Sequence, residues 1–147
     1  MIKVEKTVVI KKPVSEVFAY VQNNENSTKW QSGVVSVKME EGPDNMVGSR
    51  YTEVRKFMGQ EMKTTMEITA FTKNVKWSAK VVKGPVPYEV TMIYESVPEG
   101  TKITTHVEGE PTGFFKLAEG MVAGTLGKSL EEDQNRLKAI LEKAQEV

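Results

Sequence analysis

The sequence has 147 residues, enough for one domain with a full hydrophobic core and too few to suggest two domains. Charged residues make up 27% and hydrophobic residues 39%, a balance typical of a soluble globular protein and not of a disordered or membrane protein. Lysine plus arginine and aspartate plus glutamate both number 20, so the formal net charge is zero. General nucleic-acid binders carry a basic surplus. We therefore expect one domain over residues 1–147, with no nucleic-acid partner.

The absence of cysteine excludes disulfides, thiol nucleophiles and thiolate metal sites. The N-terminal run MIKVEKTVVIKK has charges throughout its apolar residues, so it does not resemble a signal peptide. No segment approaches the roughly 20 apolar residues that a membrane span needs. These features predict a cytoplasmic protein without an integral membrane segment, as a monomer or a homodimer.

The N-terminal region predicts one strand followed by two short helices. Residues 2–10 alternate between apolar and polar side chains, which favours a strand. Pro13 suits the first turn of a helix, because a backbone N–H at that position would have no hydrogen-bond partner within the helix. A second short turn is predicted to run on to Trp30. The apolar stripe of the first helix consists of Val14, Val17, Phe18 and Val21, at helical spacing.

The middle of the chain predicts a series of strands joined by short turns. Such links favour antiparallel hairpins, because parallel crossovers need about a dozen residues or more. The predicted strands cover residues 33–40, 47–57, 61–71, 74–82, 86–96 and 101–110.

One long helix is predicted at the C-terminus, from about Thr112 to Gln145. Glycines within it cost roughly 1 kcal/mol each relative to alanine. They indicate either close approach to the sheet or a mild kink, or else room beside Met121 for a bound molecule or a mobile, lid-like N-terminal half. The charge run EEDQNRLK is interpreted as a solvated helix face. The glycines are Gly120, Gly124 and Gly127.

Alternation along four of the strands predicts one continuous apolar face, because residues paired across a hairpin share a face. The pattern indicates a curved sheet with a single apolar surface and an outer face of mainly Lys, Glu and Thr. The predicted inward residues are Met62, Met66, Ile68 and Ala70; Val75, Trp77, Ala79 and Val81; Tyr88, Val90, Met92 and Tyr94; and Ile103 and Val107.

The hairpin around Met58-Gly59-Gln60 allows two registers. A two-residue turn at Met58-Gly59 would place Tyr51, Glu53 and Arg55 on the apolar face, where the two charges would have to pair. A bulge or a three-residue turn would leave both charges in water. Strand alternation alone does not choose between the two registers.

This order of elements is that of the helix-grip fold, an α+β fold. In it, a curved seven-stranded antiparallel sheet wraps around a long C-terminal helix, and two short helices lie between strands 1 and 2. The stretch KKPVSEVFAYVQNNENSTKWQSGVVSV resembles the opening of the START-like (SRPBCC) superfamily, in its polyketide cyclase/dehydrase branch. There a Pro-x-x-x-Val-Phe/Trp helix precedes a polar stretch and a tryptophan. The matching residues here are Pro13, Val17, Phe18 and Trp30. MVGSRY resembles the glycine-led third strand of that branch, and ITAFTKNVKWSAK its next strand–turn–strand.

The resemblance implies a cavity between the sheet and the long helix. Members of the superfamily bind lipids, sterols, hormones, polyketides or other apolar molecules, and a minority catalyse cyclisation, dehydration or hydrolysis. We therefore expect the protein to bind or carry a small hydrophobic molecule without a cofactor. A cofactor-independent cyclase or dehydrase is one alternative, and a protein-interaction module is another, although the polar outer face argues against a large docking patch.

The predicted ligand-contacting residues combine methionines, which suit an adaptable apolar site, with aromatic residues. Ordinary core filling is the alternative for each of them. The set consists of Trp30, Tyr51, Met62, Met66, Trp77, Tyr88, Met92, Phe114, Leu117 and Met121.

The candidates for catalysis are Tyr51, Glu53 and Arg55. A buried carboxylate can be poised to take a proton beside a carbonyl, and an arginine or a tyrosine hydroxyl can stabilise the resulting enolate. The alternative is that the two charges pair on the exposed face or hold the polar head of a ligand. His106, the only histidine, is predicted to point to solvent, and a zinc site with several histidines is excluded.

Overall fold

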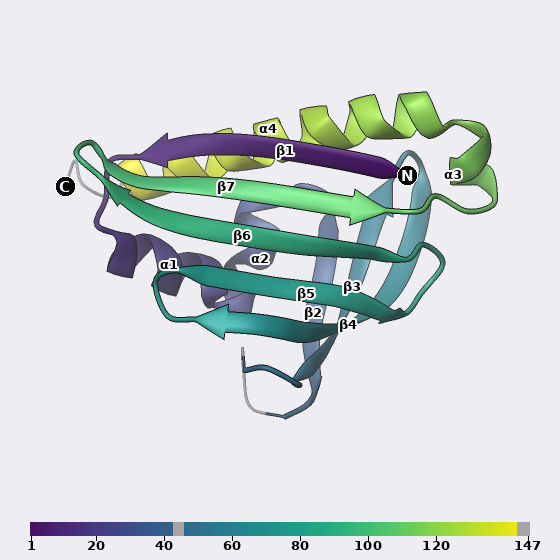
Figure 1. Cartoon of the computed structure of the whole chain (residues 1–147), viewed down its shortest axis with the longest axis horizontal. Coiled ribbons are helices and arrows are strands. Elements are labelled where there is room, and N and C mark those ends of the chain that lie inside the picture. The colour runs from purple at the N-terminus through teal and green to yellow at the C-terminus, as the bar shows by residue number, and fades with distance from the viewer. Residues whose placement is uncertain (43–45, 144–147) are drawn as a thin grey trace.

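The computed structural model describes residues 1–42 and 46–143, and seven strands in it form one antiparallel sheet (Figure 1). The strand order is β1-β7-β6-β5-β4-β3-β2. The strands are β1 (Ile2–Ile10), β2 (Val34–Glu41), β3 (Arg50–Phe57), β4 (Gln60–Thr72), β5 (Lys76–Lys83), β6 (Tyr88–Val97) and β7 (Gly100–Gly109).

The helices lie between β1 and β2 and after β7. Figure 1 shows β2 and β3 crossing behind the other strands, while the last helix runs along β1. The prediction of a helix-grip fold is confirmed. The helices are α1 (Val14–Gln22), the 3₁₀ turn η1 (Asn24–Asn26), α2 (Ser27–Trp30), α3 (Phe114–Leu117) and α4 (Glu119–Lys143).

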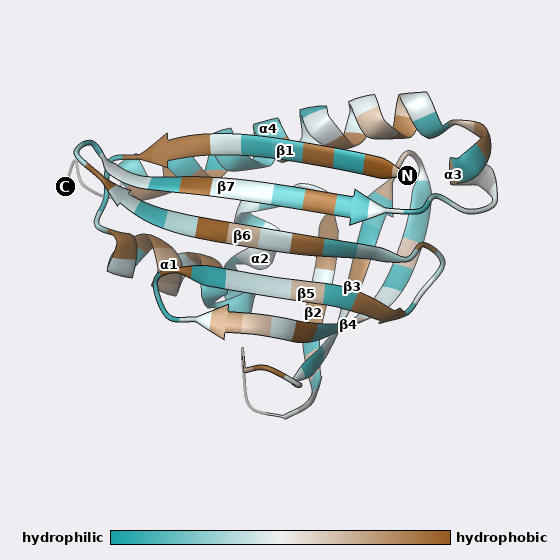
Figure 2. Ribbon diagram, viewed as in Figure 1, coloured by the Kyte–Doolittle hydropathy of each residue, from teal (hydrophilic) through white to brown (hydrophobic). Residues whose placement is uncertain are grey.

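The inner face of the sheet follows the predicted alternation, and Figure 2 shows apolar and polar residues alternating along the strands. Met66, Ile68 and Ile103 are almost fully buried. Two predicted positions were wrong. A register shift between Ile68 and Ala70 pairs Phe71 with Trp77, so Phe71 takes the inward place instead of Ala70. Val75 lies in the turn before β5 and is half exposed.

The core joins α1 and α4 to the sheet. The ring of Phe18 makes edge-to-face contacts with Phe71 and Tyr94, at centroid distances of 5.5 Å and 4.8 Å. Leu137 of α4 and Trp30 of α2 belong to the same buried cluster. This packing fixes the positions of the helices that border the site.

One continuous C-terminal helix from about Thr112 was predicted, and this prediction is wrong. The structure has two helices, because α3 ends at Leu117 and α4 begins at Glu119. Ala118 between them has φ −117° and ψ 31°, outside the helical region. The predicted end at Gln145 lies outside the described residues. The break therefore occurs at an alanine and not at a glycine.

The three glycines of α4 have different surroundings. An added Cβ at Gly127 would lie 3.5 Å from the Lys6 side chain and 3.7 Å from that of Val4, so this turn packs against β1. A Cβ at Gly120 or Gly124 would meet no atom within 4 Å. Close approach to the sheet is thus confirmed for Gly127 alone.

The turn between β3 and β4 decides the register that the sequence left open. Met58 and Gly59 both have positive φ angles, 52° and 77°, and the flanking Phe57 and Gln60 pair directly. This is the geometry of a two-residue type I′ turn. It turns Glu53 and Arg55 toward the interior.

Candidate functional site

A cavity of about 450 Å³ lies between the inner face of the sheet and α4. Its walls include residues of β3 to β7, the α2–β2 connection and the inward side of α3 and α4. Buried Phe115 and Val122 close it on the side of the last two helices. The predicted ligand-contacting residues that line it are Trp30, Tyr51, Met62, Met66, Trp77, Tyr88 and Met92.

Leu117 and Met121, also predicted to contact a ligand, do not line the cavity. Their exposed fractions are 92% and 65%, because the break at Ala118 turns these two side chains to solvent. Met121 therefore does not border this cavity. The side chain of Phe114 lies outside the described part of the structure.

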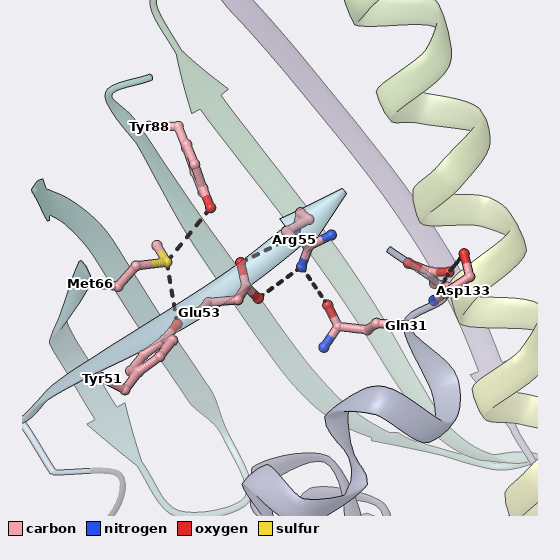
Figure 3. Close-up of polar contacts among 8 residues, drawn as sticks. Gln31, Tyr51, Glu53, Arg55, Met66, Tyr88 and Asp133 are labelled. Carbon is pink, nitrogen blue, oxygen red and sulfur yellow. Dashed lines mark hydrogen bonds and ion pairs between the residues drawn. The ribbon is translucent and has the colours of Figure 1, made fainter. Parts of the chain in front are cut away.

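Glu53 and Arg55 form an ion pair inside the cavity (Figure 3). Arg55 Nε donates to Glu53 Oε2 at 3.1 Å, and Arg55 Nη2 donates to Glu53 Oε1 at 3.0 Å, a two-pronged contact. Nη2 also donates to Gln31 Oε1 at 2.8 Å. Burial alone would lower the pKa of Arg55, but the charge and hydrogen bonding of Glu53 raise it above its usual range, so the guanidinium stays charged.

Two tyrosines share one weak acceptor beside this pair. The hydroxyls of Tyr51 and Tyr88 both donate to Met66 Sδ, at 3.4 Å and 3.7 Å (Figure 3). A thioether sulfur is a poor acceptor. Burial, and then the charge of Glu53, raise the pKa of both tyrosines, so both hydroxyls remain protonated donors.

Asp133 and Gln134 are site residues that the sequence interpretation missed. The run EEDQNRLK was interpreted as a solvated helix face, yet Asp133 and Gln134 are each only 4% exposed. They lie between Leu130 and Leu137 at helical spacing, and that spacing was the available signal. Gln134 Nε2 donates to the Lys6 carbonyl at 3.1 Å and to Thr105 Oγ1 at 3.2 Å, which ties α4 to the sheet.

Asp133 connects α4 to the segment after α2. Its Oδ1 accepts from Ser32 N at 3.2 Å, Ser32 Oγ at 3.4 Å and Arg136 Nη1 at 3.1 Å. Arg136 Nη1 also donates to the Trp30 carbonyl at 3.0 Å. Burial raises the pKa of Asp133, while the Ser32 amide and the charges of Arg55 and Arg136 oppose that rise. The connection that includes Gln31 is thus held from both β3 and α4.

His106 lies on the outer face, as predicted from strand alternation. Its Nε2 is 3.1 Å from Glu108 Oε1, its Nδ1 is 3.7 Å from Glu5 Oε1, and its side chain is 39% exposed. Among the residues that the structure describes, no group of His, Asp and Glu side chains is arranged to hold a metal ion. Nor does any helix in residues 1–42 or 46–143 have the length and apolarity to cross a membrane.

Comparison with solved structures shows the same fold in other proteins. A START superfamily protein from Mycobacterium smegmatis has a TM-score of 0.79 and 16% identity, over 98% of this chain and 99% of that chain. TTHA0849 from Thermus thermophilus has a TM-score of 0.75 and 19% identity, over 94% of this chain and 98% of that chain. The di-domain ARO/CYC StfQ from the steffimycin biosynthetic pathway has a TM-score of 0.78 and 14% identity, over 99% of this chain and 52% of that chain.

At these identities the structural likeness shows the fold and not a shared activity. A comparison with curated protein sequences finds no significant match. The family described as "Polyketide cyclase / dehydrase and lipid transport" matches residues 1–142, which confirms the resemblance found in the sequence. The chain therefore belongs to the polyketide cyclase/dehydrase and lipid transport family.

Proposed function

We propose that the protein binds or carries a small, largely apolar molecule in the cavity between the sheet and α4. The observation that carries the proposal is a space of about 450 Å³ whose largely apolar walls surround the ion pair of buried Glu53 and half-buried Arg55. Protein cores leave few voids larger than a water molecule, so a space of this size is not a packing defect. It lies within the usual size range of small-molecule sites.

The lining also argues against simple core filling. Met62, Met66 and Met92 come from two separate strands and border the same space. Methionine side chains adapt readily to differently shaped apolar partners. The family and fold support this ligand-binding role.

Native mass spectrometry of freshly purified protein tests the proposal directly, since a bound molecule adds its mass to that of the chain. A titration with N-phenyl-1-naphthylamine, an uncharged apolar fluorophore, provides an affinity. We expect Leu130→Trp, which adds bulk to the cavity wall, to weaken this binding about tenfold or more.

Met121→Trp is the matched control, because it adds the same side chain to the exposed side of the same helix. Its affinity for the fluorophore is expected to stay within about twofold of the original protein. Equal weakening by both variants, or no binding at all together with no co-purified mass, would contradict the proposal.

A second candidate is a cofactor-independent cyclase or dehydrase, favoured by the position of Glu53, Arg55, Tyr51 and Tyr88 in one cavity. Glu53 would take a proton from carbon beside a ketone, and the C–H electron pair would move to give an enolate oxygen. Arg55 or a tyrosine hydroxyl would donate to that oxygen. Attack of the enolate carbon on a second carbonyl would form the new C–C bond, and the proton on Glu53 would neutralise the resulting alkoxide.

Deuterium exchange tests the first of these steps. With 1-phenyl-1,3-butanedione in D₂O, we expect the protein to accelerate deuterium incorporation at the carbon between the carbonyls, as measured by NMR. Glu53→Gln is expected to remove most of that acceleration, about a hundredfold, because the base is lost. Exchange that continues unchanged in this variant, with fluorophore binding retained, would exclude Glu53 as the base.

A further inference from the structure

The cavity contains hydrogen-bond donors that the protein leaves open. Arg55 uses Nε and Nη2 for Glu53 and Gln31, whereas its Nη1 has no hydrogen-bond partner among the described residues. The hydroxyls of Tyr51 and Tyr88 reach only the weak sulfur acceptor of Met66. A ligand with an oxygen acceptor would satisfy a donor here.

One strong acceptor is also open. The hydrogen bonds to Asp133 from Ser32 and Arg136 all end on Oδ1, and its Oδ2 accepts none from the described part of the chain. Asp133 lines the cavity and is 4% exposed. Arg55 comes from β3 and Asp133 from α4, and Figure 3 shows Arg55 between Glu53 and Asp133. A ligand hydroxyl could therefore donate to Asp133 on α4 while a ligand carbonyl accepts from Arg55 on β3.

The charges of the site oppose a negatively charged ligand. The charged residues on the cavity wall are the buried Glu53 and Asp133, the half-buried Arg55 and the exposed Lys56. Asp133 is paired with Arg136, so the described wall offers a ligand anion no buried cation without a carboxylate partner. Glu53 occupies the Nε–Nη2 edge with which Arg55 would otherwise hold a ligand carboxylate in a two-pronged contact. A buried anion without such a partner is costly.

At the hydroxyls of Tyr51 and Tyr88, the negative charge of Glu53 outweighs the positive charge of Arg55. At Tyr51 and Tyr88, the charge of Glu53 raises the pKa more than the charge of Arg55 lowers it. Negative charge is thus disfavoured at both hydroxyls, and a ligand carboxylate placed there would meet the same field.

We propose, building on the proposed ligand-binding function, that the cavity selects uncharged apolar molecules bearing a carbonyl and a nearby hydroxyl group over carboxylates of the same apolar size. The carbonyl oxygen accepts from Arg55 Nη1, and the hydroxyl donates to Asp133 Oδ2. Fatty acids are disfavoured because Glu53 already pairs with Arg55, the half-buried cation of the cavity wall.

Isothermal titration calorimetry at about pH 7.5 tests this selection with two ligands that share a decyl chain, 1-hydroxydodecan-2-one and undecanoate, the latter ionised at that pH. The hydroxyketone is expected to bind about tenfold or more tightly than the carboxylate. Undecanoate binding equally or more tightly would overturn the selection and leave the ligand-binding function standing. If neither ligand binds while N-phenyl-1-naphthylamine does, the selection alone fails. If none of the three binds and no mass co-purifies with the protein, both proposals fail.

Glu53→Gln supplies a reversal test. Arg55 then retains a charge that a ligand carboxylate can pair with, so undecanoate affinity is expected to rise about tenfold or more. Glu131→Gln is the matched control, because it changes the net charge equally at an exposed position of α4 outside this cavity. Its affinities for both ligands are expected to stay within about twofold of the original values.

Asp133→Asn tests the acceptor separately, and circular dichroism establishes that each variant is folded. The amide can keep an oxygen toward Ser32 and Arg136 while replacing Oδ2 with a donor. The ratio of hydroxyketone to undecanoate affinity is expected to fall about tenfold. The proposal would be overturned if Glu53→Gln and Asp133→Asn, where folded, both kept the original ratio of hydroxyketone affinity to undecanoate affinity.

Discussion

Replacing Arg55 with methionine is expected to lower the free energy of unfolding by about 3 kcal/mol. Arg55 donates two hydrogen bonds to Glu53, which is 7% exposed and has Tyr51 as a neighbour on the same face. Without the guanidinium, the carboxylate would be left as an uncompensated charge in an apolar wall. Urea denaturation followed by circular dichroism measures the loss.

The double variant Glu53→Leu with Arg55→Met is the control for this loss. Because it removes both charges, it is expected to recover about 2 kcal/mol relative to the single variant. A loss below about 0.5 kcal/mol in the single variant would mean that water, and not Arg55, compensates Glu53. A double variant no more stable than the single one would assign the loss to packing of the Arg55 stem.

Replacing Leu137 with alanine is expected to lower the free energy of unfolding by about 3–4 kcal/mol. Leu137 is completely buried in the cluster that includes Ile10, Phe18 and Ile103, where it joins α4 to the sheet. The loss combines the removed apolar contacts with the void left behind. Thermal and urea unfolding measure it.

Leu117→Ala is the matched control, because the same substitution is made at a residue that is 92% exposed. Its effect is expected to stay within about 0.5 kcal/mol. Leu137 does not line the cavity, so folded Leu137→Ala is expected to bind N-phenyl-1-naphthylamine within about twofold of the original affinity. Equal destabilisation by the two variants would contradict the observed break between α3 and α4.

The two leucines also show the limit of helical periodicity. Leu117 and Leu137 both fall on the apolar pattern of the predicted helix, but Ala118 interrupts the helix between them. Near the break, Phe115 and Val122 are buried, whereas Leu117 and Met121, which belong to the same apolar pattern as Val122, are exposed. A repeat of apolar residues predicts a helix face, but it does not show where the helix is broken.

The charge pair shows the same limit in the sheet. Strand alternation allowed Glu53 and Arg55 to face inward or outward, because a one-residue change of register exchanges the two faces. Positive φ angles at Met58 and Gly59 close a two-residue turn and select the inward register. Type I′ turns favour Asn, Asp or Gly at their first central position, so Met58 does not predict this turn from the sequence.

The sequence by itself determined the helix-grip architecture and the strands. It also determined which strand side chains line the cavity, namely Met62, Met66, Trp77, Tyr88 and Met92. Strand periodicity and short connections are local properties, so one chain segment at a time suffices to predict them. The tertiary structure decided that Glu53 and Arg55 pair inside the cavity and that Asp133 lies in its wall. Asp133 and Ser32 are 101 residues apart in the sequence. Helical spacing indicates that Asp133 lies on the inward face of α4, but its contact with Ser32 depends on how α4 docks against the α2–β2 connection, which no local pattern encodes.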